Sequence, residues 1–311
     1  MPKLSDYELK ALAVLEHRQS LYEKQVQKAL ADALLSIRGE LSRLYDKYSV
    51  KGLLTRAEMT KYNKYITMET QMLKLINPAI AANIKTIKYM LPEQYNASFF
   101  NYAWAMDNGN GVRLAWGIVD TKAVQAAFDI TNPKNIELKE ALHNYGPSAK
   151  KYIRNALLKN LSRGKGYTEM VNDIKAALNK TAFEALRILR TEGQRAISRG
   201  QDDAYLRARE KGIEGDIIWD ATKDIRTRAS HGRADGTIKS ADGLFHTKDF
   251  IAEYPLDPNL SAEESINCRC RERFQITGYS PQLMRTREEG IIPYQTFSEY
   301  AKEWHPEWLK K

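Results

Sequence analysis

The sequence is short of cysteine and of long apolar runs, and both shortages narrow its class. It has 2 Cys in 311 residues, which argues against the disulfide framework of a secreted scaffold. These are Cys268 and Cys270, and a Cys-x-Cys spacing is too short for an unstrained disulfide, so we expect two reduced thiols. No run approaches the roughly 18 consecutive apolar residues of a membrane span, and the N-terminal residues lack the apolar block of a signal peptide. We expect a globular protein with no membrane partner.

Positive charge is concentrated in one part of the chain. The net charge is +9, and residues 133–213 hold 17 Lys or Arg against 9 Asp or Glu, which is +8 of that total. Such a region suits a polyanion, bound through its phosphates without sequence choice. The alternative is a solvated helical surface, since no aromatic or base-reading pattern is interleaved. The candidate DNA-binding residues are Lys150, Lys151, Arg154, Lys159, Arg163 and Lys165.

The N-terminal part has the apolar spacing of a long helix. Apolar residues step by three and four between Val26 and Tyr48, which places them on one stripe. An unbroken helix over 5–48 would be about 65 Å long at 1.5 Å per residue. It should pack along another long helix or a neighbouring subunit, and the alternative is a hairpin broken near 18–20. Thr55 is predicted to cap a further helix over 55–77, and Pro78 to begin the next, ending near residue 90.

Residues 93–120 are aromatic and contain the turn signal Asn-Gly-Asn-Gly at 108–111. They predict a helix or strand, a loop, and a short strand over 112–118. Further helices are predicted from residue 121 onward. The string at 163–166, Arg-Gly-Lys-Gly, lacks the first glycine and the Ser or Thr of a phosphate-binding loop, so it indicates a helix end followed by an N-cap at Thr168. The predicted helices are 121–128, 135–144, 147–162, 168–179 and 181–212.

The rarest residue types gather between residues 216 and 273. This segment holds both cysteines and two of the five histidines. Residues 217–219 are a strand candidate, Asp235-Gly236 is a strong turn dipeptide, and two prolines keep 254–258 extended. We interpret the segment as a small β-meander with long loops. The predicted fold class is therefore mainly α with a small C-terminal α+β module.

Four regions follow from these patterns. Residues 1–130 are a helical region containing the long helix, 131–213 are a basic helical region, and 214–276 are the α+β module. Residues 277–311 form an aromatic tail in which Phe297, Tyr300 and Trp304 share one helical face. That face docks either on its own domain or on a partner.

The module carries a recognisable order of residues. The string Trp-x-Ala-x-x-Asp-x-Arg-x-Arg-x-x-His-x-x-x-Asp-Gly is followed by Pro-x-Asp-Pro and by Ile-Asn-Cys-Arg-Cys, and Arg-Thr-Glu at 190–192 with Arg195 precedes it. This order resembles the tailed-phage minor head, or head morphogenesis, proteins related to phage Mu protein F. The resemblance covers roughly the C-terminal third of the chain. Its signature residues here are Trp219, Asp224, Arg226, Arg228, His231, Asp235, Gly236, Asn267, Cys268, Arg269 and Cys270.

The resemblance implies a non-enzymatic virion component, present in few copies. It implies a place in the capsid interior near the portal vertex, after assembly from the host cytoplasm. The implied partners are the portal protein and packaged double-stranded DNA, with the major capsid or scaffolding protein as further alternatives. The implied role is head morphogenesis or genome ejection. Toxin-bearing relatives extend beyond the signature, whereas about 40 residues follow it here, so we expect no appended effector domain.

Three chemical interpretations of the module stay open. Cys268 and Cys270 with His231, and with His246 as a further ligand, form a candidate zinc site, and apart from zinc no cofactor is expected. His231 is otherwise a candidate general base with Asp235 or Asp224 and Asn267, which would make the protein a metal-dependent DNA-acting hydrolase. We prefer the third interpretation, in which Trp219 packs the module, the charged residues cross-link its loops and the cysteines fill small buried sites.

Overall fold

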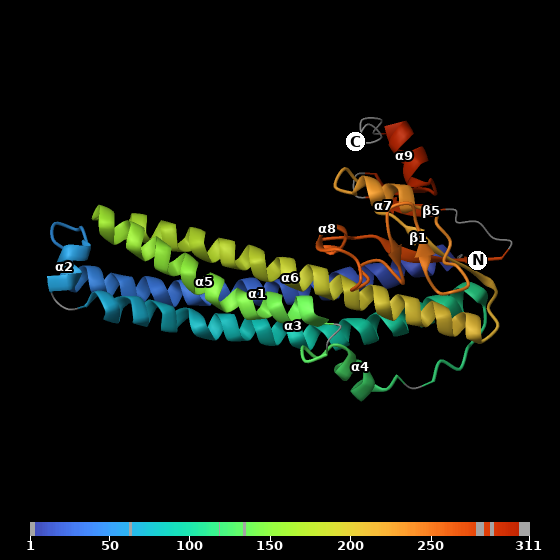
Figure 1. Ribbon diagram of the computed structural model, residues 1–311, viewed down its shortest axis with the longest axis horizontal. Helices are drawn as coiled ribbons and strands as arrows, with labels where there is room; N and C mark the ends of the chain where they lie inside the picture. Colours follow the sequence, from blue (N-terminus) through green and yellow to red (C-terminus); the bar gives the residue numbers. More distant parts are fainter. Residues whose placement is uncertain are drawn as a thin grey trace. The chain divides into compact units, whose positions relative to one another are not determined.

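The computed structural model describes residues 4–61, 64–117, 119–132, 135–277, 283–286 and 289–304. Long helices make up most of it, and short antiparallel strand pairs occur near the C-terminal end (Figure 1). The predicted fold class, mainly α with a small C-terminal α+β module, is confirmed. Within the described ranges, no helix combines the length and apolarity that crossing a bilayer requires.

The predicted long N-terminal helix is present without a break as α1 (Leu4–Tyr48). The apolar stripe that predicted it is buried, including Val26, Ile37 and Leu41. Thr55 caps the next helix, since its Oγ1 accepts the Glu58 N–H at 3.1 Å. The other helices before the module are α2 (Arg56–Lys61), α3 (Tyr65–Asn110), α4 (Thr121–Ala127), α5 (Ile136–Arg163) and α6 (Tyr167–Glu210).

Four predicted helix boundaries are wrong, because the helices continue through them. Helix α3 runs through Pro78 and Pro92, α5 runs through Pro147, and α6 joins the two helices predicted over 168–179 and 181–212. A proline in a helix interior costs about 3 kcal/mol. Each of these helices buries apolar residues on both sides of the predicted break, and tertiary packing of such a face supplies most of a helix's stability. Packing therefore outweighs the local signal.

The strand predicted over 112–118 is not found. Residues 112–117 have no regular secondary structure, and residue 118 lies outside the described residues. This segment is held instead by Asp107, whose Oδ1 accepts the Leu114 N–H at 2.9 Å and the Trp116 indole N–H at 3.0 Å. Trp116 therefore anchors an irregular segment, whereas the aromatic residues before it, such as Phe99 and Tyr102, lie on α3.

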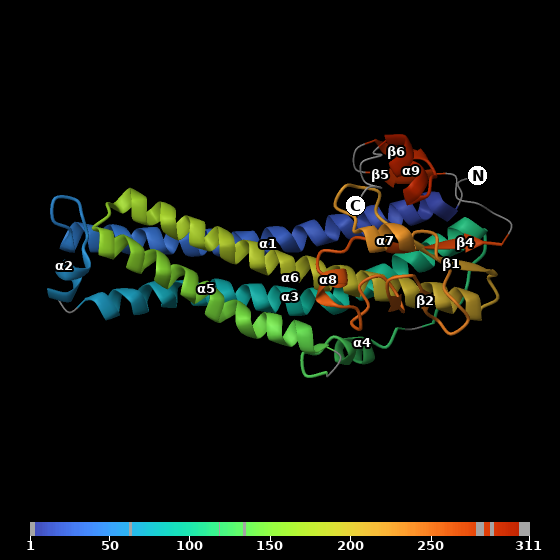
Figure 2. The same cartoon turned by 45° about the horizontal axis from the view of Figure 1, so that its top comes forward.

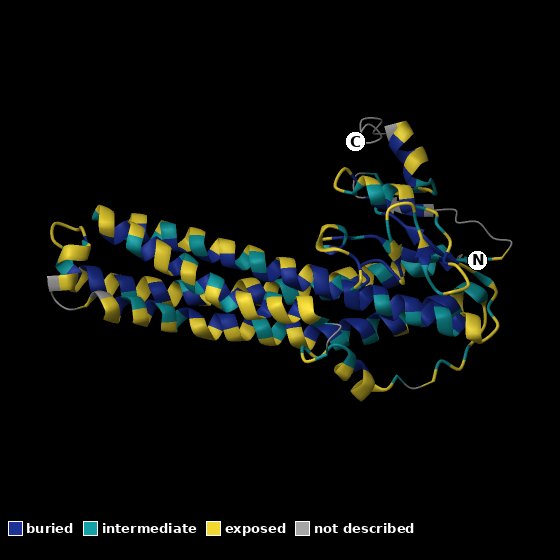
Figure 3. Cartoon of the chain, viewed as in Figure 1, coloured by how far each residue is buried: buried dark blue, intermediate teal, exposed yellow. Residues whose placement is uncertain are grey.

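The chain divides into two compact units, each made of segments distant in sequence. The first unit consists of residues 1–19, 90–129 and 190–311, and the second of residues 20–89 and 130–189. In the second unit, segments of α1, α3, α5 and α6 run alongside one another in both views (Figures 1 and 2). Their outward faces are largely exposed and their inward faces buried (Figure 3). Inside this unit, buried Asn83 donates a hydrogen bond to Tyr145 Oη at 2.8 Å.

The C-terminal module belongs to the first unit, and its strands do not pair in the consecutive order of a meander. Strand β1 (Gly215–Asp220) pairs antiparallel with β4 (Arg271–Ile276), with Ile217 opposite Phe274. The first and last strands of the segment therefore close it. The remaining elements are α7 (Ala229–Ala234), β2 (Phe245–His246) paired with β3 (Ile251–Ala252), α8 (Ala262–Ser265), β5 (Leu283–Thr286) paired with β6 (Gly290–Pro293), and α9 (Phe297–Trp304).

One hydrophobic core joins the module to the helical segments of the first unit. Leu15 of α1, Phe99 of α3 and Tyr205 of α6 belong to the same buried cluster as Trp219 and Phe274. The module therefore shares its core with three helices and has no separate core of its own. Removing any one of these helices would expose part of the module's core to water.

The aromatic face of the tail packs within its own unit. Phe297 and Tyr300 are buried in a small cluster with Met284. The backbone N–H of Phe297 donates to Asp235 Oδ2 at 2.6 Å, which fixes the start of α9. Of the two alternatives for this face, docking on its own domain agrees with the structure for these two residues. The Trp304 side chain lies outside the described part.

Candidate functional site

The signature charges of the module cross-link its loops. The buried carboxylate of Asp224 accepts the Arg226 N–H at 2.8 Å and both terminal nitrogens of Arg269, one at 2.8 Å. Burial raises the pKa of Asp224, but the Arg269 guanidinium outweighs it and holds that pKa below its usual range. Arg228 donates from Nη2 to the Ile266 carbonyl at 2.6 Å. The loop after β1 is thereby tied to the loop before β4.

A buried lysine lies at the centre of a second cross-link. Lys223 Nζ lies 2.8 Å from Asp220 Oδ1 and 2.8 Å from Asp235 Oδ1. Arg271 adds a bond to Asp220 at 2.9 Å. Burial opposes ionisation of Asp220, but Lys223 and Arg271 outweigh it and lower its pKa. Gly236, with φ +83, then provides the turn that the Asp-Gly dipeptide predicts. Lys223 is not among the predicted site residues, because it lies between signature positions and carries no motif of its own.

A third buried charge cluster was also missed. Lys239 pairs with Glu272 Oε1 at 3.0 Å and with Asp202, and the side chain of Lys239 is fully buried. Burial raises the pKa of Asp202 to about 6, although Lys239 opposes the shift. Burial likewise raises the pKa of Glu272. One lysine therefore faces two carboxyl groups. No local signal identifies this cluster, because its three members are far apart in the sequence.

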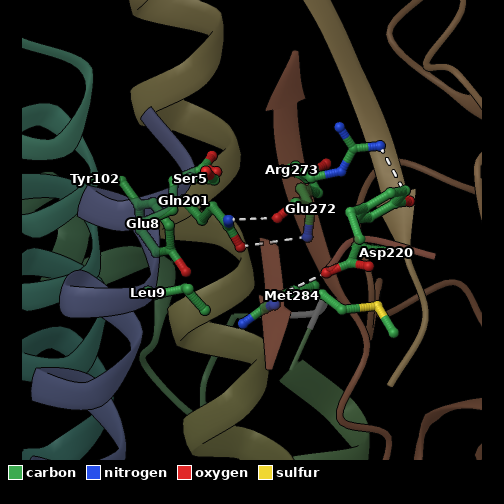
Figure 4. Close-up of a pocket in the computed structure, with 11 residues that line it drawn as sticks. Ser5, Glu8, Leu9, Tyr102, Gln201, Asp220, Glu272, Arg273 and Met284 are labelled. Atoms are coloured by element: carbon green, nitrogen blue, oxygen red, sulfur yellow. Dashed lines mark hydrogen bonds and ion pairs between the residues drawn. The ribbon is translucent and has the colours of Figure 1, made fainter. Parts of the chain in front are cut away.

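A small cavity lies beside these charges, between the helices and β4 (Figure 4). Its volume is about 20 Å³, which is room for about one water molecule. The partly buried Glu8 carboxylate lines it, accepting the Tyr205 hydroxyl and the Phe274 N–H, the latter at 3.1 Å. Burial raises the pKa of Glu8. Gln201 bonds to both backbone groups of Glu272, so its amide extends the hydrogen bonding of β4.

His231 and the two cysteines come together inside the module. His231 Nδ1 lies 3.3 Å from Cys270 Sγ and 3.4 Å from Cys268 Sγ. The three residues are 1%, 2% and 4% exposed, respectively. The Trp219 ring packs edge-on against the imidazole with centroids 5.7 Å apart. His246, the further candidate ligand, is outside the cluster and contacts Asp242 at 2.6 Å.

The two cysteine thiols differ in how readily they ionise. The hydrogen bond from Cys270 lowers the pKa of the Cys268 thiol, and the same contact together with burial raises the pKa of Cys270. One thiolate is thus favoured and a second is opposed. A cation between the two sulfurs would stabilise both in the ionised form.

The residues that the catalytic interpretation requires are either engaged in other hydrogen bonds or, among the described residues, not bonded to His231. Both carboxylate oxygens of Asp235 are used, by Lys223 and by backbone N–H groups of Ala221 and Phe297. Asn267 lies in a left-handed turn with φ +57, and its N–H donates to Thr191 Oγ1 at 3.2 Å. Within the part of the chain that the structure describes, no hydrogen bond joins His231 to either residue. A catalytic role for them stays a prediction.

The weaker upstream match is bonded to the module. Arg195 donates from Nη1 to Glu192 at 2.8 Å and from Nε to the Leu256 carbonyl at 2.9 Å. Thr191 accepts the Asn267 N–H described above. The Arg-Thr-Glu turn of α6 therefore anchors two loops of the module, Leu256 and Asn267. This contact explains why the two matched stretches occur in one protein.

The candidate DNA-binding residues lie in the second unit, on α5 and in the turn after it. Three of them are ion-paired: Arg154 with Glu69 at 2.6 Å, Lys159 with Asp173 at 3.0 Å, and Lys165 with Glu169 at 2.5 Å. Among the described residues, no ion pair is formed by the other three. Half of the predicted cations are thus partly neutralised within the chain. The remaining three are Lys150, Lys151 and Arg163.

Residues 151–273 match the family described as Phage Mu protein F like protein. The resemblance drawn from the sequence is therefore confirmed, since residues 151–273 are similar to this family.

Two relatives align over nearly all of the chain. Minor head protein GP7 of Bacillus phage SPP1 is 29% identical over 297 residues, covering 90% of this chain and 92% of the relative. A protein of Enterococcus faecalis (strain ATCC 700802 / V583) named NAD(+)--arginine ADP-ribosyltransferase EFV is 23% identical over 294 residues, covering 94% of this chain but only 59% of that relative. The chain thus spans less than two thirds of the second relative. No solved structure matches.

Proposed function

We propose that this protein is a minor head protein of a tailed phage, located in the virion and acting in head morphogenesis or genome ejection. The observation that carries the proposal is the alignment with the SPP1 minor head protein, which extends over 90% of this chain and 92% of that one. Because the alignment covers nearly all of both chains, it includes the helices that lie outside the family match. The match over residues 151–273 supports the same assignment independently.

The portal protein is the partner that we propose. The name of the SPP1 relative makes it a component of a phage head. In this chain α1, with 45 residues, and α3, with 46, present long polar faces for attachment to an assembly. We place the protein in the capsid interior near the portal vertex, where packaged DNA is the neighbouring polyanion. The cations of α5 are the proposed contact to that DNA, without sequence preference.

We further propose that the protein is not an enzyme. The groups that would carry hydrolysis are engaged in structural bonds, above all Asp235. The cavity beside these buried charges, at about 20 Å³, is far below the roughly 300 Å³ of a small-molecule site. A larger hollow of about 270 Å³ lies apart from them, in the basic region, and is lined by Lys159, Arg163 and Glu169. The activity in the name of the E. faecalis relative belongs to a longer protein, and we do not extend it to this chain.

Coexpression with its cognate portal protein tests this proposal. The expected result is a complex that copurifies on a portal tag and elutes with the portal oligomer in size-exclusion chromatography. The tagged portal expressed alone, mixed with an unrelated helical protein of similar size, is the control. A chain that stays monomeric beside an assembled portal contradicts the proposal.

The competing function has its own assay. The purified protein is incubated with plasmid DNA and Mg²⁺, Mn²⁺ or Zn²⁺, beside a His231→Ala variant whose fold is checked by circular dichroism. If the unsubstituted protein cleaves the plasmid and the folded His231→Ala variant does not, the protein is a metal-dependent nuclease and our proposal is wrong. We expect no cleavage from either protein.

A further inference from the structure

Two sulfurs and one ring nitrogen face a common point inside the module. Among the described residues, His231, Cys268 and Cys270 form the one group whose donor atoms could share a metal ion, and these atoms all lie within 4.8 Å of one another. They come from α7 and from the loop before β4. The set therefore joins the two halves of the module that β1 and β4 close.

The local sequence explains why both sulfurs point the same way. Alternate residues of an extended chain place their side chains on one side, so Cys-x-Cys directs two thiols together. The left-handed turn at Asn267, with φ +57, starts this extended stretch directly after α8. Arg269, between the cysteines, points the other way and bonds to Asp224. The alternation thus separates a charged side from a thiol side.

The separations fit a tetrahedral ion. With Zn–S near 2.3 Å and Zn–N near 2.05 Å, tetrahedral angles put nitrogen and sulfur about 3.6 Å apart. The observed separations between His231 Nδ1 and the two sulfurs are 3.3 and 3.4 Å. A thiol hydrogen bond explains one such contact, because Nδ1 has a single lone pair or a single proton. A shared cation explains both.

The outer surroundings also suit a metal ligand. The other ring nitrogen, His231 Nε2, lies 2.8 Å from Glu264 Oε2, a carboxylate that also accepts the Ser230 hydroxyl at 2.9 Å. The contact is a charge pair and does not have the geometry of a hydrogen bond. A carboxylate at this distance favours a proton on Nε2, which leaves Nδ1 free to bind a metal. Trp219 and Phe250 rings cover the imidazole, with centroids 5.7 and 5.4 Å away.

We propose that His231, Cys268 and Cys270 bind one zinc ion per chain, which fastens α7 to the loop before β4. Two thiolates and an imidazole are the donor set of a borderline-soft cation, which favours zinc over calcium or magnesium. The fourth position is left to water or to a small ligand. The site is independent of the proposed virion role, since it rests on the module's own geometry.

The first experiment measures metal in the unsubstituted protein. Purified protein, dialysed against metal-free buffer, is analysed by inductively coupled plasma mass spectrometry, and about one zinc per chain is expected. Replacement by Co²⁺ should add thiolate-to-cobalt charge-transfer absorption, which reports sulfur coordination without any substitution. A folded protein that holds less than a tenth of an equivalent of zinc and gives no such absorption overturns the proposal.

Variants assign the metal to these residues. Cys268→Ser with Cys270→Ser, and separately His231→Ala, should lower zinc content at least tenfold. His246→Ala is the matched control, because His246 is exposed and outside the cluster, and it should keep the full equivalent. If the double variant does not fold, a strong chelator is added to the unsubstituted protein, and a lowered Tm restored by zinc is expected. An unchanged Tm there counts against the site.

Discussion

Three of the six candidate DNA-binding cations are ion-paired and, within the described part of the chain, three are not. This difference predicts how DNA binding should depend on salt. Each phosphate contact contributes about −0.9 to the slope of log K against log[salt]. If only Lys150, Lys151 and Arg163 contact phosphates, the slope is about −2.7, and raising salt from 50 to 200 mM weakens binding about 40-fold. If all six cations do so, the slope is about −5.4 and the loss about 2000-fold. The ion pairs seen in the second unit favour the smaller value.

The assay is fluorescence anisotropy of a labelled duplex at several salt concentrations. Replacing Lys150, Lys151 and Arg163 together by Gln should remove most of the slope. Replacing Lys24, Lys85 and Lys88 by Gln is the matched control, since these are exposed lysines of α1 and α3 that carry the same total charge. A slope near −5 would show that the three ion-paired cations also contact phosphates, which contradicts the prediction. Equal slopes for the two triple variants would show that Lys150, Lys151 and Arg163 do not contact the DNA.

Three further predictions concern stability, each measured as the free energy of unfolding in urea. Trp219→Ala should cost about 3–5 kcal/mol, since the ring is fully buried. Asp224→Ala should cost about 1–3 kcal/mol, because it leaves a partly buried Arg269 unpaired. Because burial raises the pKa of Asp202 to about 6, its contribution is largest at low pH and is lost as pH rises through 6, so stability should fall by about 1 kcal/mol between pH 5 and 7.

Controls separate these effects from general damage. Trp104→Ala removes a ring that is 42% exposed and should cost clearly less than Trp219→Ala. Arg226→Ala, beside the same carboxylate but mostly exposed, should change stability by less than about 0.5 kcal/mol. Asp202→Asn should flatten the dependence between pH 5 and 7. A dependence that survives this substitution would assign the titration to another group.

The sequence predicted those features that local patterns determine. The unbroken α1, the Thr55 cap, the turn at Gly236 and the mainly α class all follow from spacing and turn chemistry. It failed where packing overrides a local rule, as at Pro78, Pro92 and Pro147, which lie inside helices.

Buried ion pairs between residues far apart in the sequence could not be predicted, for a different reason. Lys239, Asp202 and Glu272 are remote in sequence, and nothing near any of them signals a buried charge cluster. The cluster of His231 with Cys268 and Cys270 could be anticipated, because these residue types are rare here and chemically distinctive. Rare residues make good sequence predictions, whereas common charged residues do not.

The hydrogen bonds that Glu8 accepts from Tyr205 and from the β4 backbone have a consequence for experiments on fragments of this protein. A fragment trimmed to residues 151–273 would lose that carboxylate together with Leu15, Phe99 and Phe274, leaving the buried Tyr205 hydroxyl without its acceptor and an apolar surface open to water. Such a fragment should be prone to aggregate. The stretch that is easiest to recognise cannot be handled as a portable piece, since it depends on α1, which is far from it in the sequence.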